Sequence, residues 1–142
     1  MKYLFITPMW NCEPWIERIH QSVINQKKDN WIWRVIDDVS EDNTWDELQK
    51  LPKDERIIIT KNDRRKLALE NVDTAIEELT PDDEDVIILL DGDDWLLGRD
   101  VLNALDKVYE QTGCWVTHGS YLEHPSYNMG AVHSPYADEV KI

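Results

Sequence analysis

A short apolar run that ends in three carboxylates constrains the fold of this chain more than any other feature. Residues 86–90 read Val-Ile-Ile-Leu-Leu, and Asp91, Asp93 and Asp94 follow them. A brief run of apolar, mostly β-branched residues between polar ones is typical of a strand covered on both faces of a parallel sheet. Open α/β sheets bind ligands just beyond the carboxyl ends of their strands. We therefore expect a buried strand over residues 86–90 with a polar site at its end.

The spacing of these carboxylates favours a cation site. Asp91 and Asp93 lie two positions apart, so in extended backbone their side chains would point to the same side, and Gly92 between them would let a ligand approach closely. The two charges repel each other unless a divalent cation, which prefers oxygen ligands, lies between them and a phosphate-bearing ligand. The simpler alternative is a solvated turn in which Asp94 caps the following helix.

The hydrophobic periodicity predicts alternating strands and helices. Apolar runs predict strands over residues 3–7, 31–36, 56–60 and 114–117, in addition to 86–90. Helical spacing and stop signals predict helices from 13 to about 26, from 43 or 44 to a stop at Pro52, over 67–79, and from 101 to a stop at Gly113. This alternation is typical of an α/β fold with a mostly parallel sheet between helices. We expect residues 1–118 to form this domain and residues 119–142 to be a loop-rich segment that begins an acceptor region.

The amino-acid composition limits the classes of molecule that this chain can bind. Among the 142 residues, 15 Lys and Arg stand against 29 Asp and Glu, a formal charge of −14, which repels nucleic acid and anionic membranes. A phosphorylated substrate would therefore need a local source of positive charge within this negative field, either a metal or the basic run Arg64, Arg65 and Lys66. Two unpatterned cysteines and the lack of a signal peptide or membrane span predict a cytoplasmic protein.

Three polar clusters follow successive predicted strands, at residues 8–11, 37–38 and 91–94. A parallel sheet would place them along one edge. An acidic residue at the end of the second strand is also where dinucleotide-binding folds hold a ribose, but the glycine fingerprint of those folds is absent after the first strand.

These motifs together resemble the nucleotide-sugar-binding half of a family 2 glycosyltransferase with the GT-A fold. The resemblance rests on the Pro-x-Trp-Asn turn at residues 8–11, the Val-Ile-Asp-Asp-Val-Ser-Glu-Asp-Asn-Thr segment at 35–44, the segment from Asn62 to Asn71, and Leu-Asp-Gly-Asp-Asp-Trp at 90–95. It covers nearly the whole chain, and its motifs are fairly specific in this order and spacing.

The resemblance implies roles for individual residues. Pro8 and Trp10 would pack against the nucleoside, and Asp38 would contact the base. Arg65 would approach the diphosphate, and Asp91 would lie near the ribose. In the same way Asp93, with Asp91, would hold Mn²⁺ or Mg²⁺, and Asp94 would contact the metal's surroundings or the sugar.

The implied activity is metal-dependent transfer of a sugar from a nucleotide-diphosphate sugar, with UDP as the expected nucleotide, to a hydroxyl of a saccharide or protein acceptor. Two departures stand out: Gly98 occupies a position where the family often has Pro, and such enzymes usually continue well beyond the length of this chain. No residue matches the family's base motif, so the catalytic base stays unassigned. His118, His124 and His133 are weaker candidates for metal ligands.

Two other functions stay open. The chain could be a nucleotide-sugar-binding module without transferase activity because the acceptor half is missing. A phosphotransferase with Asp91 as nucleophile is the third reading, but such enzymes, which resemble haloacid dehalogenases, carry their acidic pair after the first strand. A donor-binding half would also expose apolar surface, so we expect self-association into a homo-oligomer or pairing with another chain.

Overall fold

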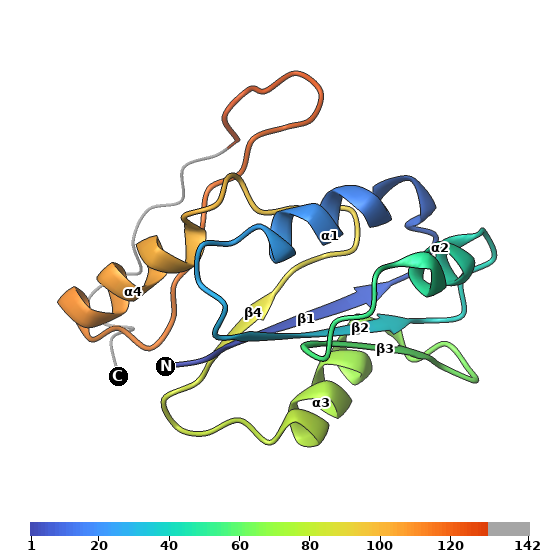
Figure 1. Cartoon of the computed structure of the whole chain (residues 1–142), viewed down its shortest axis with the longest axis horizontal. Helices are drawn as coiled ribbons and strands as arrows, with labels where there is room; N and C mark the ends of the chain where they lie inside the picture. The colour runs from blue at the N-terminus through green and yellow to red at the C-terminus, as the bar shows by residue number, and fades with distance from the viewer. Residues whose placement is uncertain (131–142) are drawn as a thin grey trace. The chain divides into compact units, whose positions relative to one another are not determined.

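The computed structural model describes residues 1–130, which belong to two units: the first comprises residues 1–107, and the second begins at residue 108. The first unit contains a four-stranded parallel sheet in the order β3-β2-β1-β4, which confirms the predicted α/β class. Its strands are β1 (Tyr3–Met9), β2 (Trp31–Asp37), β3 (Ile57–Lys61) and β4 (Val86–Leu89). Figure 1 shows β1 and β2 side by side with their carboxyl ends at the same edge of the sheet.

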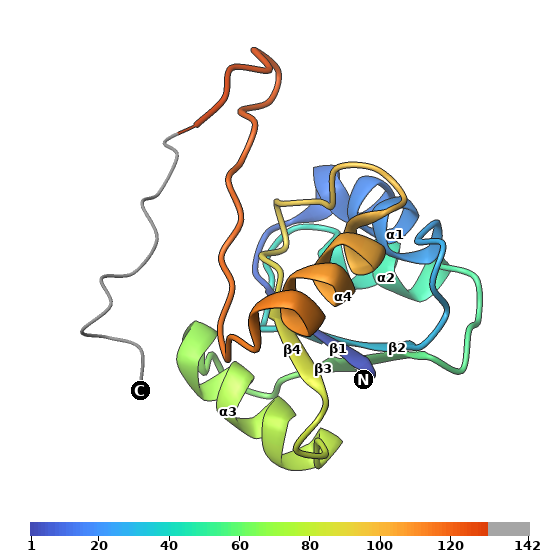
Figure 2. The same cartoon turned by 90° about the vertical axis from the view of Figure 1, so that its left-hand side faces the viewer.

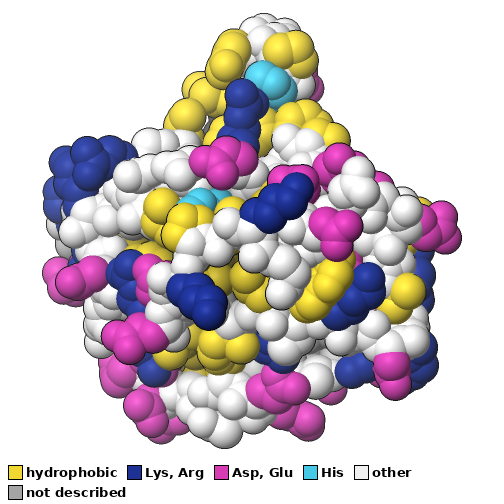
Figure 3. Space-filling view, turned by 45° about the vertical axis from the view of Figure 1, so that its right-hand side comes forward, with side chains coloured by type: hydrophobic (Ala, Val, Ile, Leu, Met, Phe, Trp, Pro, Cys, Tyr) yellow, Lys and Arg dark blue, Asp and Glu magenta, His cyan; other side chains and the backbone are white. Residues whose placement is uncertain are grey.

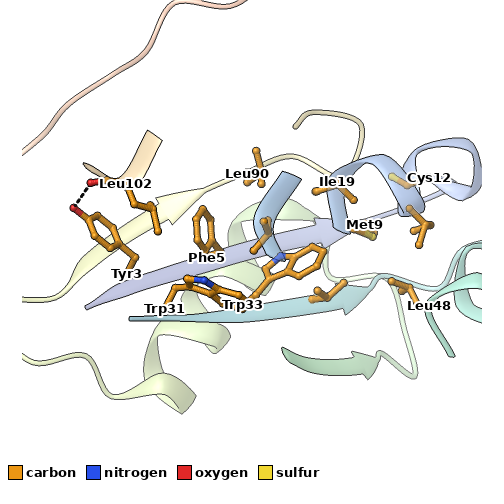
Figure 4. Packing of buried hydrophobic residues seen from close by; sticks show 13 residues of the cluster. Tyr3, Phe5, Met9, Cys12, Ile19, Trp31, Trp33, Leu48, Leu90 and Leu102 are labelled. Atoms are coloured by element: carbon orange, nitrogen blue, oxygen red, sulfur yellow. Dashed lines mark hydrogen bonds between the residues drawn. The ribbon is translucent and has the colours of Figure 1, made fainter. Parts of the chain in front are cut away.

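The larger core lies on one face of this sheet, under α1 (Ile16–Ile24), α2 (Thr44–Lys50) and the start of α4 (Val101–Thr112). A short 3₁₀ helix, η1 (Glu13–Trp15), precedes α1, so the helix predicted from residue 13 begins with a tighter turn. Alternate residues of β1 and β2 point into this core, among them the fully buried Phe5 and Trp33 (Figure 4). The buried Tyr3 hydroxyl donates to the Leu102 carbonyl oxygen at 3.2 Å, so this polar group is satisfied in the core.

The opposite face is covered by α3 (Leu67–Leu79), which confirms the predicted helix over residues 67–79. Ile6, Ile36 and Ala75 form a smaller core there. Figure 2 shows α3 across the strands from α1 and α2. The sheet is therefore a middle layer, as both faces of a parallel sheet require.

The strand predicted over residues 86–90 forms and packs on both cores, through Val86 and Ile88 on one face and Ile87 on the other, but its residues 86–89 are half-buried or exposed instead of fully buried. In the described part of the chain, β4 pairs only with β1 and lies at the edge of the sheet, with Leu89 63% exposed. An apolar run indicates a strand but not its position in the sheet order, because that order depends on pairing partners far away in the sequence. The expected self-association stays a prediction.

The extended backbone in which Asp91 and Asp93 would point to the same side does not persist beyond β4. The strand ends at Leu89, and residues 91–94 form a turn in which the Asp94 amide donates to the Asp91 carbonyl oxygen at 3.0 Å. Gly92 is buried in this turn, whereas the three aspartates are exposed.

The second unit begins within α4, at Val108. The helix α4 ends at Thr112, and Gly113 follows it with φ of +61° and donates its amide to the Tyr109 carbonyl oxygen at 2.9 Å. The strand predicted over residues 114–117 does not form: Trp115 and Val116 are 86% and 65% exposed, and no strand of the described residues 1–130 pairs with them. Within residues 1–130, no helix is long and apolar enough to cross a membrane.

Candidate functional site

The turn after β1 is the part of the sheet edge that connects the other polar segments. The Met9 carbonyl oxygen accepts the amide hydrogen of Asp38 at 2.8 Å, which fixes the end of β2 beside this turn. The Asn11 amide donates to the Ser40 hydroxyl at 3.0 Å, and the Cys12 amide donates to the Thr44 hydroxyl at 2.7 Å. The clusters at residues 8–11 and 37–38 therefore meet at one edge, as predicted.

The acidic turn packs against the same segment through Gly92. A Cβ atom on Gly92 would lie 2.7 Å from the Cys12 sulfur and 2.8 Å from Met9 Cγ, which no real contact allows. Figure 4 shows Met9 and Cys12 at the end of β1. On the other side of the turn, Trp95 stacks on Trp15 with 6.0 Å between ring centroids. Glycine at position 92 thus lets the acidic turn touch the turn after β1.

The three aspartates form no hydrogen bond or ion pair of their side chains within residues 1–130. Partial desolvation of its carboxyl by nearby protein atoms, together with the neighbouring charges of Asp93 and Asp91, raises the pKa of Asp94. Such crowded, unpaired carboxylates fit a divalent cation, and Mg²⁺-type sites commonly take one or two carboxylates and fill their remaining positions with substrate phosphates and water. Over the same residues, no group of three or more His, Cys, Asp or Glu side chains converges as a preformed metal cage. The donor set therefore fits a cation that the ligand helps to hold.

Asp38 is buried, 3% exposed, and bonded on both oxygens. Its Oδ1 accepts from the Asn62 side chain and the Lys66 amide, both at 2.8 Å, and its Oδ2 accepts from the Leu67 amide at 2.9 Å. Burial acts to raise the pKa of Asp38, but the hydrogen bonds from Lys66, Asn62 and Leu67 outweigh it and lower the pKa below its usual value. Asp38 is therefore an ionised carboxylate that joins β2 to the segment before α3.

Arg65 reaches from that segment to the turn after β1. Its guanidinium carbon lies 3.8 Å from the centroid of the Trp10 ring, and its Nε lies 3.7 Å from Asp38 Oδ2. The neighbouring Arg64 pairs with Glu70 instead, in an exposed bridge. Of the two arginines in the basic run, only Arg65 therefore lies at the predicted site, where it contacts Trp10 and Asp38.

Asn62 and Asn71 are functional candidates to which the sequence alone gave no role. The Asn62 side chain donates to Asp38 and, at 2.7 Å, to the Asn71 side-chain oxygen, and Asn71 donates to the Leu67 carbonyl oxygen at 2.9 Å. Asn71 is 2% exposed. An asparagine on the buried face of a predicted amphipathic helix was the available signal, because a buried amide needs hydrogen-bond partners.

A cleft of about 180 Å³ opens beside these asparagines, between α3 and strands β2 and β3. It is lined by Arg34, Ile36, Thr60, Lys61, Asn62, Lys66, Asn71, Thr74, Ala75 and Glu78. Figure 3 brings forward the side of the molecule to which the strands point, and Lys and Arg side chains are interspersed there with Asp and Glu. Despite the charge of −14, cationic groups are thus available at this side.

The histidines named as weaker metal candidates gain no support. In the second unit, His124 packs edge-on against Tyr127 with 5.9 Å between ring centroids. His118 belongs to no group of metal-ligating side chains within residues 1–130. His133 lies outside the described residues.

Solved structures of other proteins share this fold. TarS 1-349 from S. aureus superposes with a TM-score of 0.64 at 18% identity, over 80% of this chain and 33% of that one. Its complex with UDP-GlcNAc gives 0.66 at 19% identity, over 80% and 32%. The mannosyltransferase PcManGT from Pyrobaculum calidifontis, in complex with GDP-Man and Mn²⁺, gives 0.62 at 20% identity, over 75% and 32%. The chain thus spans about a third of these solved chains.

The search of curated proteins gives no match. The family model described as Glycosyl transferase family 2, by contrast, matches residues 4–128, which is most of the chain. The chain therefore belongs to glycosyl transferase family 2, as its four motifs predicted.

Proposed function

We propose that this protein takes part in metal-dependent transfer of a sugar from a nucleotide-diphosphate sugar to an acceptor hydroxyl, and that the described sheet edge is the donor site. The observation that supports this most is the meeting of three motifs at one edge. The Met9 carbonyl oxygen accepts a hydrogen bond from the Asp38 amide, and Gly92 packs on Met9 and Cys12. The Arg65 guanidinium lies over the Trp10 ring. These contacts place an aromatic ring, a cation and carboxylates close together, which is the chemistry that a nucleoside diphosphate needs.

Each residue has a proposed role at this edge. Pro8 and Trp10 pack against the nucleoside, and the ionised Asp38 accepts a hydrogen bond from the base. Arg65 contacts the diphosphate through charge-assisted hydrogen bonds. The exposed acidic turn supplies contacts to the ribose, the metal and the sugar through Asp91, Asp93 and Asp94 respectively.

The metal would be held by Asp93 with Asp91. Mn²⁺ or Mg²⁺ bound there would supply positive charge that stabilises the departing nucleoside diphosphate. The chain's own residues orient the donor and keep its base and phosphates in place. Deprotonation of the acceptor hydroxyl requires a base, and we assign none.

UDP is the proposed nucleotide and the cytoplasm the proposed compartment. TarS was solved with UDP-GlcNAc and PcManGT with GDP-Man and Mn²⁺, so both uridine and guanosine nucleotides should be compared. Both cysteines are free, which fits a reducing environment.

Calorimetric titration of UDP tests the donor site. We expect the wild-type chain to bind UDP with Mn²⁺ and to lose most of that affinity in EDTA. The variant Asp93→Asn should lose about tenfold or more of the Mn²⁺-dependent affinity, because an amide is a poorer cation ligand than a carboxylate. The matched control is Asp83→Asn, which neutralises an exposed aspartate in the loop before β4.

The outcomes separate the parts of the proposal. Mn²⁺-dependent UDP affinity that survives in Asp93→Asn would remove the metal assignment. No binding of UDP or GDP in either condition would contradict the donor site itself. Binding without hydrolysis or transfer of UDP-sugars would instead favour the nucleotide-sugar-binding module.

A further inference from the structure

Arg65 lies where the base of a nucleotide would have to go. Its guanidinium covers the Trp10 ring at 3.8 Å, and its Nε lies 3.7 Å from Asp38 Oδ2. The Arg65 side chain therefore lies next to both the covered face of Trp10 and the Asp38 carboxylate. A base that stacks on this face and bonds to Asp38 therefore competes with Arg65.

Asp38 adds to this competition because its oxygens are already in use. Lys66 and Leu67 donate their backbone amides to it, and Asn62 donates its side chain. These groups belong to the fold, since the backbone of residues 66–67 cannot leave without disrupting the start of α3. Arg65 is the partner that can withdraw, because its side chain is 41% exposed and makes only a long contact with Asp38.

The withdrawn guanidinium needs a new partner. Arg64, the preceding residue, is already paired with Glu70, whereas Arg65 makes only the long contact with Asp38. An incoming anion can therefore bind Arg65 more easily than Arg64. A cation over an exposed aromatic ring is held weakly, whereas a guanidinium on a phosphate forms two charge-assisted hydrogen bonds. A diphosphate can thus compensate for the lost contact with Trp10, and a bare nucleoside cannot.

We propose that Arg65 is a specificity-determining residue that makes binding of the base conditional on the presence of phosphates. Without ligand, it covers Trp10 and the open side of Asp38. With a nucleoside diphosphate, it moves to the phosphates and frees the base site. The inference rests on the proposed donor site and adds a selection of nucleoside diphosphates over nucleosides.

The test compares uridine and UDP on three forms of the whole chain in the presence of Mn²⁺: wild type, Arg65→Ala and Arg64→Ala. Affinities are measured by calorimetry for UDP and by ligand-observed NMR for uridine. Arg65→Ala should bind uridine about threefold to fivefold more tightly, because the cover over Trp10 is removed. The same variant should bind UDP about tenfold more weakly, because a charged partner of the phosphates is lost.

Arg64→Ala is the matched control, because it removes the same charge from the same segment without exposing Trp10. It should leave uridine affinity unchanged. Uridine is uncharged, so a gain confined to Arg65→Ala cannot come from the altered field. If Arg65 had only a structural role, Arg65→Ala would lower the affinity for uridine and for UDP alike.

Two results would overturn the inference. If wild type binds UDP and Arg65→Ala binds uridine no more tightly than wild type, the donor site stands and the selective role of Arg65 is wrong. If wild type binds no UDP, both the proposed donor site and the proposed role of Arg65 are wrong. Thermal unfolding of each variant checks that the fold is intact.

Discussion

At the scale of single residues, Gly92 is the position at which side-chain volume decides the geometry of the acidic turn. In Gly92→Ala the new Cβ would meet the Cys12 sulfur at 2.7 Å and Met9 Cγ at 2.8 Å, and both neighbours are buried. Overpacking of this kind costs about 1–3 kcal/mol of unfolding free energy. We expect that loss in urea denaturation, together with weaker Mn²⁺-dependent UDP binding, because the turn must move away from β1.

A second substitution isolates this mechanism. Cys12→Ala removes the sulfur that the new Cβ would strike, so Gly92→Ala in a Cys12→Ala background should cost less than in wild type. A double-mutant cycle measures that difference. Costs that simply add would mean that Gly92 matters for some reason other than its contact with Cys12.

At the scale of elements, the start of α3 depends on a side chain from β2. The residue that precedes this helix, Lys66, forms no side-chain cap, and Leu67 has φ of +65°, so the backbone there is strained. Asp38 compensates by accepting the amides of both residues, and its negative charge is favourable at a helix N-terminus. One carboxylate therefore holds two secondary structure elements together.

Asp38→Ala tests this connection. It leaves the partly buried amides of Lys66 and Leu67 without their acceptor, so we expect a loss of about 1–3 kcal/mol in stability. Hydrogen exchange at these two amides should accelerate more than exchange in β1. The control is Asp63→Ala, which removes an exposed carboxylate from the same segment. If exchange at residues 66 and 67 is unchanged, Asp38 contributes to the ligand site and not to the fold.

This structural role also changes how binding data should be interpreted. The sequence predicts that Asp38→Ala weakens nucleotide binding through the base. In the structure the same change also releases the segment that carries Arg65. Binding losses in Asp38→Ala must therefore be compared with its stability before any part is assigned to the base.

At the scale of the whole molecule, one buried histidine couples folding to pH. His20 is 2% exposed and stacks on Trp33, and its Nδ1 has no hydrogen-bond partner among residues 1–130. Burial lowers the pKa of His20 from 6.5, although the charges of Glu17 and Asp54 act in the opposite direction. The unfolded chain thus binds a proton more readily than the folded chain. The stabilising contribution is fully present above the unfolded pKa and is lost as the pH falls below it toward the folded pKa.

Urea denaturation between about pH 7.5 and 5 measures this dependence. Stability should decline through that range in wild type, and His20→Phe, which keeps an aromatic ring on Trp33 but cannot be protonated, should flatten the decline. An equal decline in both proteins would show that other groups govern acid stability.

Much of the architecture could be read from local patterns. The helix over residues 67–79 and the strands near 3–7, 31–36 and 56–60 were found because hydrophobic periodicity reflects burial on one face or two. The meeting of residues 8–11 with Asp38 followed from parallel topology alone, since parallel strands end at the same edge. The prediction of a strand over residues 114–117 was wrong, because apolar residues form a strand only where another strand pairs with them.

The sequence by itself determined the α/β class, the family and the carboxylates that mark the sheet edge, because these depend on residue type and spacing along the chain. Tertiary structure alone decided that β4 is an edge strand, that Gly92 packs on Cys12, and that Arg65, not Arg64, lies on Trp10. The physical reason is the same in each case. Pairing order, close packing and the partner of a charged group depend on atoms that are distant in sequence, and folding alone brings them together.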